Sequence, residues 1–440
     1  RPGRQDAQSP LKKPVRCLSM VSRRTLLIGA AAAAALVWAR PRKFSGGHSN
    51  YFAKLNAALR RQGIDRPILL IDLDRLDRNI ERLRKSLGTG TPRNYRIVAK
   101  SLPSPGLIDY IATRAATDSV MVFHRPFIEE VARRRPQADL LLGKPMPVAA
   151  AASFYEHHRG RFDPARQLQW LIDSDARLAQ YLQLAQGRGL KLRVNLEIDV
   201  GLHRGGYAGP DALVAALDTI AAHPDHLDFS GFMGYDAHLM GLPGFLASGE
   251  IPRVKSRYKA CIDLLHNRFP RLAQGPLTFN GAGSPSFRFY ESDTTLNDIS
   301  VGSALMKPSH YDLPMLNDFE PSAFIAAPVL KRHSSTGIPT LEWLAEPMTI
   351  WDRNTADRLF IYGGNWLADP ISPAGVERAG LYASSNQEGY HAAKGVRLAV
   401  DDFLFLRPTQ SEAVLLQFGD LVAIRGERIE QRWPVLQVAG

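Results

Sequence analysis

The chain has 440 residues, of which 45% are hydrophobic and 22% are charged, as is usual for globular proteins and unlike disordered chains. The formal net charge of +12 is concentrated at the N-terminus. Residues 1–43 carry ten Lys and Arg against one Asp, whereas the remaining 397 residues carry 45 basic and 42 acidic side chains. The main part of the chain is therefore near neutral, and we expect no nucleic-acid partner.

The first segment is typical of an export signal. Arg23-Arg24 precedes the apolar stretch Leu26–Ala39, whose last three residues offer a cleavage site. The stretch is shorter than the ~20 apolar residues that span a bilayer. We therefore expect residues 1–43 to form an upstream segment and a twin-arginine-like signal, with translation starting at Met20 and the protein in the periplasm. The alternatives are an uncleaved signal, which would be the chain's one membrane contact, or a chance Ala-rich helix in a cytoplasmic protein.

Short β-rich runs alternate with helical patterns over residues 60–305. After a first run at 67–73, we expect eight strands, at 95–99, 119–123, 139–142, 168–172, 191–198, 228–233, 276–280 and 298–302. Helices are expected at 104–114, 125–135, 146–158, 175–188, 210–222 and 252–268. This alternation predicts a (β/α)₈ TIM-like barrel. A doubly wound open sheet is the second possibility, but the Gly-rich nucleotide fingerprint is absent after the first strand.

The amino-acid composition and the pattern of apolar runs change after residue 305. Pro, Gly and short β-rich runs dominate residues 306–440. This segment predicts a smaller, mostly β C-terminal domain, so the fold class is α/β with a barrel followed by a β domain.

Polar residues gather where the expected strands end, which is where barrels of this type carry their active sites. The first strand ends at Lys100, a lysine that either simply reaches solvent or is needed there for chemistry. Weaker candidates, expected at the surface, are His124 and Lys144. The remaining strand-end residues are Asp173, Glu197, Asp199, His203, Arg204, Tyr235, Asp236, His238 and Ser303.

The segment "NGAGS" (280–284) follows the seventh strand. Gly281 and Gly283 let backbone N–H groups turn toward an anion, and Ser284 adds a hydroxyl donor. Phosphate sites in such barrels commonly use the loops after strands seven and eight. A lysine whose amine is desolvated becomes a competent Schiff-base nucleophile. Together, Lys100 and a phosphate site suggest pyridoxal phosphate (PLP) as cofactor; a phosphosugar-binding barrel with an unrelated lysine is the alternative.

Several segments together resemble the fold-type III PLP enzymes, above all the branch of D-threonine aldolases and D-serine dehydratases, with alanine racemase more distant. They are "PILLIDLDRLDRNIERL" (67–83), the strand ending in Lys100, "EIDVGLHRGG" (197–206), "GYDAH" (234–238), "GAGS" (281–284) and "ISVGSALM" (299–306). The resemblance implies a barrel plus a β domain, usually as a homodimer whose partner helps to close the site. It places Lys100 in the Schiff base with PLP. The other cofactor-binding positions implied are Arg204 near the phenolic oxygen or the substrate, Tyr235 near the pyridine ring, and Gly281, Gly283 and Ser284 on the phosphate.

The chain departs from that family at its C-terminus. Aldolase and dehydratase members carry a metal-binding His with a Cys or Asp there, but residues 419–434 contain neither His nor Cys. Glu412 keeps a carboxylate where the family often has Glu-His, and Ala413 stands in place of the His. We therefore name no metal ligand and doubt that a divalent metal is bound.

The resulting hypothesis is a PLP-dependent lyase that acts on D-amino acids through a Schiff base on Lys100. The candidate catalytic bases are Lys100, His238 and His203, although each histidine can equally be an ordinary loop residue. The partner is a small-molecule amino-acid substrate. Two alternatives stay open: an amino-acid racemase, and a non-catalytic PLP-binding protein.

Overall fold

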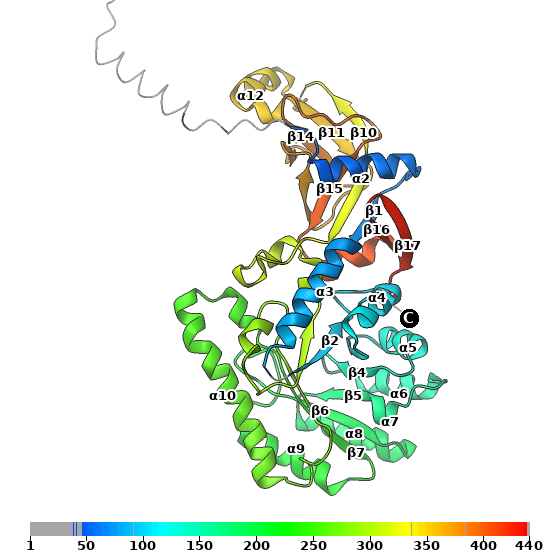
Figure 1. The fold of residues 1–440 in the computed structure, drawn as a ribbon, viewed down its shortest axis with the longest axis vertical. Helices are drawn as coiled ribbons and strands as arrows, with labels where there is room; N and C mark the ends of the chain where they lie inside the picture. Colours follow the sequence, from blue (N-terminus) through cyan, green and yellow to red (C-terminus); the bar gives the residue numbers. More distant parts are fainter. Residues whose placement is uncertain are drawn as a thin grey trace, which may run out of the picture.

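The computed structural model describes residues 46–437 except 91, 336 and 383, together with Trp38 and Pro41. Apart from those two residues, the expected upstream segment and signal lie outside the described residues. Figure 1 shows two bodies stacked along the long axis, a helix-covered barrel and a smaller β body, with helix α3 (Leu73–Leu87) between them. Of the helices in the described part of the chain, none combines the length and the hydropathy that crossing a bilayer requires.

Within the described residues, eight parallel strands pair in chain order and close into a barrel, which confirms the predicted fold. Most residues of these strands are buried, and the majority are apolar, although buried polar side chains such as Arg96, Gln169 and Asp298 lie among them. The barrel closes where its first strand pairs with its last, with Tyr95 opposite Ile299. The strands are β2 (Asn94–Val98), β3 (Ser119–Val122), β4 (Asp139–Leu142), β5 (Leu168–Ile172), β6 (Leu192–Glu197), β7 (Leu227–Gly234), β8 (Thr278–Gly281) and β9 (Asp298–Val301).

Helices follow the strands and cover the barrel. They are α4 (Pro105–Ala115), α5 (Arg125–Arg134), α6 (Val148–His157), α7 (Pro164–Gln167), α8 (Asp175–Arg188), α9 (Pro210–Ala222), α10 (Gly244–Arg268) and the short α11 (Ser303–Met306). Between β8 and β9 the chain forms one 3₁₀ turn, η2 (Phe287–Tyr290), as expected. The helix expected at 252–268 begins earlier, at Gly244, and Pro252 lies inside it. An internal proline lacks an N–H donor and crowds the preceding turn, and Gly244 and Gly249 have low helix propensity, so the sequence of these first turns does not indicate a helix.

The second body is a mainly antiparallel sheet, as predicted for residues after 305. Its strands are β10 (Ala323–His333), β11 (Asp357–Ile361), β12 (Ala368–Ser372), β13 (Val376–Arg378), β14 (Gly389–Ala392), β15 (Phe403–Pro408), β16 (Asp420–Arg425), β17 (Arg428–Pro434) and, from before the barrel, β1 (Ile68–Asp72). The order is β13-β14-β11-β10-β1-β16-β17, with β15 pairing both β10 and β12. Short helix α12 (Ala345–Trp351) lies between β10 and β11, and short helix α13 (Ser411–Val414) lies between β15 and β16.

Strand β1 therefore belongs to the β domain, although it lies within the range 60–305 expected for the barrel. It pairs antiparallel with β10 and parallel with β16. Its alternate residues enter two different cores: Leu69 and Ile71 join the main core, while Ile68 and Leu70 pack in a second core under helix α2 (Asn50–Arg61). The run at 67–73 is expected in addition to the eight barrel strands, but an apolar run that is buried on both faces can join either sheet, so its sequence does not show which one.

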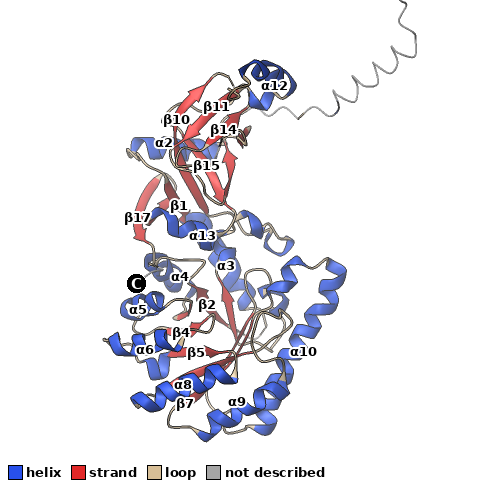
Figure 2. Ribbon diagram, turned by 180° about the vertical axis from the view of Figure 1, so that it is seen from behind, coloured by secondary structure: helices blue, strands red, loops and turns tan. Residues whose placement is uncertain are grey.

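The two bodies are held together close to the mouth of the barrel. The hydroxyl of Ser104 donates to the carbonyl of Pro434 at 2.7 Å. Gly106 lies directly under Trp433, where a Cβ atom would come within 2.3 Å of the indole ring. Figure 2 shows helix α13 of the β domain between the sheet and the barrel. The chain's own β domain therefore contributes to the surroundings of the barrel mouth.

Candidate active site

A cavity of about 530 Å³ opens at the C-terminal ends of the barrel strands. Such a volume suits a small-molecule ligand. Its lining comes from loops after β2 to β9 and from helix α13 of the β domain. Of the predicted site residues, the cavity brings together Lys100, Arg204, Tyr235, Gly283 and Ser284.

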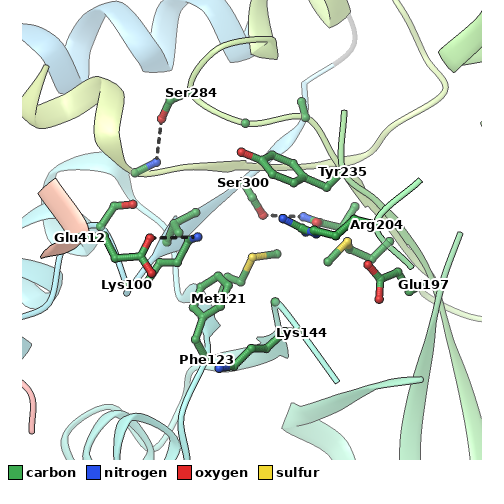
Figure 3. A pocket seen from close by; sticks show the side chains of 18 of the residues that line it. Lys100, Met121, Phe123, Lys144, Glu197, Arg204, Tyr235, Ser284, Ser300 and Glu412 are labelled. Carbon is green, nitrogen blue, oxygen red and sulfur yellow. Dashed lines mark hydrogen bonds and ion pairs between the residues drawn. The ribbon is translucent and has the colours of Figure 1, made fainter. Parts of the chain in front are cut away.

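Lys100 follows β2 and points into this cavity (Figure 3). Its ammonium nitrogen lies 3.1 Å from Oε2 of Glu412 and 5.0 Å from the centre of the Phe123 ring. The side chain is 34% exposed. The lysine without an acidic neighbour in sequence thus has one in space, supplied by the β domain.

Tyr235 and Arg204 form one side of the cavity. The Arg204 guanidinium carbon lies 5.2 Å from the centre of the Tyr235 ring, a cation–π distance. Burial raises the pKa of the Tyr235 hydroxyl well above its ordinary value. Tyr235 therefore stays neutral at physiological pH and presents a flat aromatic face to a ligand.

The loops after β8 and β9 form a cup of donors. The backbone N–H groups of Gly302 and Ala304 both donate to Oγ of Ser284, at 3.3 and 2.9 Å. Convergence of two amides on one oxygen is the geometry that binds an anion oxygen. Gly283 leaves room for the Tyr235 ring, because a Cβ atom there would lie 2.8 Å from Cε2 of Tyr235.

Gly281 lies outside the cavity lining, unlike the expectation. It is the last residue of β8 and is buried, and a Cβ atom there would lie 2.8 Å from the side chain of Leu296. Its small size serves packing between strand and loop.

The two histidines expected as bases also lie outside the cavity. His203 is 79% exposed, and its Nδ1 lies 2.7 Å from Asp199, which also accepts the N–H groups of Gly201 and His203. The Asp199 carboxylate thereby shapes the loop that carries Arg204, and the histidine ring is turned away. His238 lies in the 3₁₀ turn after β7, where its Nε2 atom is 3.7 Å from Glu250 and next to Gly201 of the loop after β6. The structure thus removes both histidines from the set of bases that line this cavity.

His124 and Lys144, expected at the surface, do line the cavity. Burial, and then the charge of Lys144, lower the pKa of His124. His124 is therefore mainly neutral at physiological pH.

Carboxylates complete the lining. Glu197 ends β6 and is buried, and this burial raises its pKa, with opposition from nearby Arg204. Asp173 lies on the same side of the cavity and adds to the rise. A buried carboxyl with a raised pKa in a cleft is a common feature of functional sites.

Glu412 and Tyr311 line the cavity from outside the barrel strands. Neither could be assigned from strand ends, because both follow the last barrel strand in sequence. Within the residues that the structure describes, no cluster of three or more His, Cys, Asp or Glu side chains is arranged to hold a metal ion.

Comparison with known proteins shows the family to which this chain belongs. The model of the family "Alanine racemase, N-terminal domain" matches residues 71–309. This chain belongs to that family. It is therefore an enzyme of the fold-type III PLP group, a lyase or a racemase, as its motifs predicted.

Individual relatives point to the same branch. The 3-hydroxy-D-aspartate aldolase of Paracoccus denitrificans (strain Pd 1222) is 22% identical over 89% of this chain and 97% of its own length. The crystal structure of D-threonine aldolase from Filomicrobium marinum has a TM-score of 0.66 at 18% identity, covering 84% of this chain and 95% of the other. D-threo-3-hydroxyaspartate dehydratase from Delftia sp. HT23 has a TM-score of 0.65 at 16% identity, covering 85% and 98%. These structures share the fold of this chain across both domains.

Proposed function

We propose that the protein is a PLP-dependent lyase acting on D-amino acids that carry a hydroxyl group on the β-carbon. The observation that carries the proposal is one cavity that combines the Lys100 amine, the flat ring of Tyr235 and the donor cup at Ser284. The named activities of the similar proteins, two of them on 3-hydroxyaspartate and one on threonine, support the substrate class.

The residues present fit PLP. Oγ of Ser284 accepts the Gly302 and Ala304 amides, which would leave its hydroxyl hydrogen to donate to a phosphate oxygen, and the space that Gly283 leaves free allows Tyr235 to lie along the cavity. Lys100 would bind the aldehyde carbon of the cofactor. Arg204, whose guanidinium faces the Tyr235 ring, would stabilise negative charge on the cofactor's phenolic oxygen or on the substrate.

PLP, when bound, supplies an electron sink for the pair released when a bond at the α-carbon breaks. The chain's own residues provide the rest of the chemistry. The Lys100 amine can hold or deliver a proton at the α-carbon. Phe123 and Met121 give the cavity an apolar wall, which limits the access of water beside the amine.

The first experiment is the visible spectrum of the purified protein incubated with PLP, before and after borohydride. We expect a visible absorption band that borohydride abolishes while fixing the cofactor to Lys100, as peptide mapping would show. Lys100→Ala should lack the fixed cofactor, whereas Lys144→Ala, which removes another cavity lysine, should retain it. A wild-type protein that stays colourless with added PLP would overturn the proposal.

Product analysis then distinguishes the reaction classes. Aldehyde or oxo-acid released from D-threonine or D-3-hydroxyaspartate indicates a lyase, whereas interconversion of D- and L-alanine alone indicates a racemase. The homodimer and the periplasmic location remain predictions, which light scattering and cell fractionation would check.

A further inference from the structure

Glu412 is a carboxylate that the β domain places in the cavity of the barrel. It lies on helix α13, and its Oε2 atom is 3.1 Å from the Lys100 nitrogen (Figure 3). Glu197, by contrast, ends a barrel strand and lies on the far side of the cavity beside Arg204. Glu412 is therefore the carboxylate best placed to act on groups bound at the lysine.

Three buried serines anchor the backbone next to Glu412, whose own side chain is 56% exposed. Ser411, directly before Glu412, pairs with Oγ of Ser303 at 2.9 Å. Ser303 in turn donates to Oγ of Ser101, directly after Lys100, at 3.1 Å. All three hydroxyls are buried. The short chain of hydroxyls therefore joins the backbone that carries the lysine to the backbone that carries the carboxylate.

The chemistry of the substrate defines what such a carboxylate can reach. If the proposed function is right, on which this inference rests, the amine of the substrate takes the place of the Lys100 amine. In a 2-amino-3-hydroxy acid the nitrogen and the hydroxyl oxygen lie on neighbouring carbons and approach each other to hydrogen-bond distance. A carboxylate in contact with the nitrogen position can thus also accept a hydrogen bond from the hydroxyl.

We propose that Glu412 is the base that accepts the β-hydroxyl proton when the bond between the α- and β-carbons is cleaved. The O–H electron pair becomes the second bond of an aldehyde carbonyl, and the pair of the broken carbon–carbon bond is left on the α-carbon. The Lys100 ammonium then protonates the α-carbon. Glu412 returns its proton to the Lys100 amine across their 3.1 Å contact, so the cycle needs no further reactant.

The proposal separates two reactions of the same enzyme. Exchange of the α-proton of D-alanine in deuterium oxide needs Lys100 but no hydroxyl base. Cleavage of D-threonine needs both. In Glu412→Gln we expect cleavage to fall by about 100-fold or more, the usual contribution of a general base, while exchange stays within about threefold of wild type. Glu412→Asp should recover part of the cleavage, and Glu377→Gln, an exposed carboxylate on β13 of the same domain, should change neither reaction.

A readout without turnover tests the contact itself. In the protein without PLP, a carbodiimide should join Glu412 to Lys100 directly, because the two groups touch, and peptide mapping would identify the linked pair. PLP should suppress the link by occupying the lysine. The dissociation constant of PLP, measured by absorbance, should be similar for wild type and Glu412→Gln.

Each result decides the matter. Cleavage by Glu412→Gln at the wild-type rate, or an equal loss of cleavage and exchange, overturns the assignment of the base. So does a wild-type enzyme that exchanges D-alanine but cleaves none of D-threonine, D-phenylserine and D-3-hydroxyaspartate. Absence of a PLP band in wild type is a different failure, because it removes the proposed function itself.

Discussion

Two cations on the first barrel strand and its end have opposite surroundings. Arg96, in the middle of β2, is 1% exposed and bonds to Asp298 through both Nε and an Nη atom and to Asp139 through an Nη atom, all at 2.9 Å. Lys100, just after the strand ends, is one-third exposed, and its one carboxylate partner among the described residues is Glu412, which is itself more than half exposed.

The difference separates charges that hold the fold from charges that serve a ligand. Burial alone would lower the pKa of Arg96, but Asp298 and Asp139 outweigh burial and raise it. A buried charge that has all its hydrogen bonds made is not available for chemistry. At the mouth, by contrast, Arg204 faces an aromatic ring and Lys100 shares one exposed partner, so a ligand can compete for both.

Replacing Arg96 gives the largest expected effect on stability. Arg96→Leu leaves the Asp298 carboxylate buried without its cation, so we expect a loss of about 3–5 kcal/mol in the free energy of unfolding. Lys100→Leu, the matched change at the mouth, should cost no more than about 1 kcal/mol because its ion pair is exposed. Urea unfolding followed by tryptophan fluorescence would measure both.

A second variant keeps this prediction testable if Arg96→Leu does not fold. The double variant Arg96→Leu/Asp298→Leu removes both charges and should recover much of the loss. If instead the Arg96 and Lys100 variants had equal stability, the distinction between structural and functional charges on this strand would be wrong.

Gly283→Ala tests whether the shape of the barrel mouth, and not only its charges, determines ligand binding. The added Cβ atom would lie 2.8 Å from the Tyr235 ring, so the ring must move. We expect a destabilisation of about 1–3 kcal/mol, as for overpacking, and about tenfold weaker binding of PLP, which corresponds to ~1.4 kcal/mol. Gly249→Ala is the control, since no described residue outside its own helix turn lies within 4 Å of its Cβ position. Unchanged PLP affinity in Gly283→Ala would show that Tyr235 does not shape the cofactor site.

Much of the barrel and the centre of the site could be predicted from the sequence. Apolar runs separated by helical periods define a barrel, and the carboxyl ends of parallel strands must meet at one rim. That rule alone brings Lys100, Arg204, Tyr235 and Ser284 into one cavity.

Other parts depend on contacts that the local pattern does not contain. His203 lies one residue before Arg204, yet it points outward because Asp199 binds its ring. Glu412 enters the site only because another domain packs on the mouth. Strand β1 looks like a barrel strand, and only its pairing with β10 and β16 assigns it to the β domain.

The smallest expected effect is on the pH dependence of stability, for which two carboxylates, one at the mouth and one beside Arg96, can be compared. Burial raises the pKa of Glu197 at the mouth, so the folded protein binds a proton there more readily than the unfolded chain does. Its favourable contribution is complete only below the ordinary pKa of glutamate and is lost as pH rises through the raised value. Glu197→Gln should therefore be more stable than wild type at neutral pH, with a difference that shrinks on acidification, as urea unfolding of the PLP-free protein at several pH values would show.

Asp139, the first residue of β4 and a partner of buried Arg96, gives the opposite sign. Burial works against its charge, but Arg96 and Arg193 outweigh burial and lower its pKa. Its contribution to stability is present above the ordinary pKa of aspartate and is lost as pH falls through the lowered value. Asp139→Asn should then be less stable than wild type at neutral pH, and the difference should shrink on acidification. If both variants changed stability in the same direction at neutral pH, nearby cations would stabilise the Glu197 carboxylate as they stabilise that of Asp139. Glu197 at the mouth would then be as well paired as the carboxylates around Arg96.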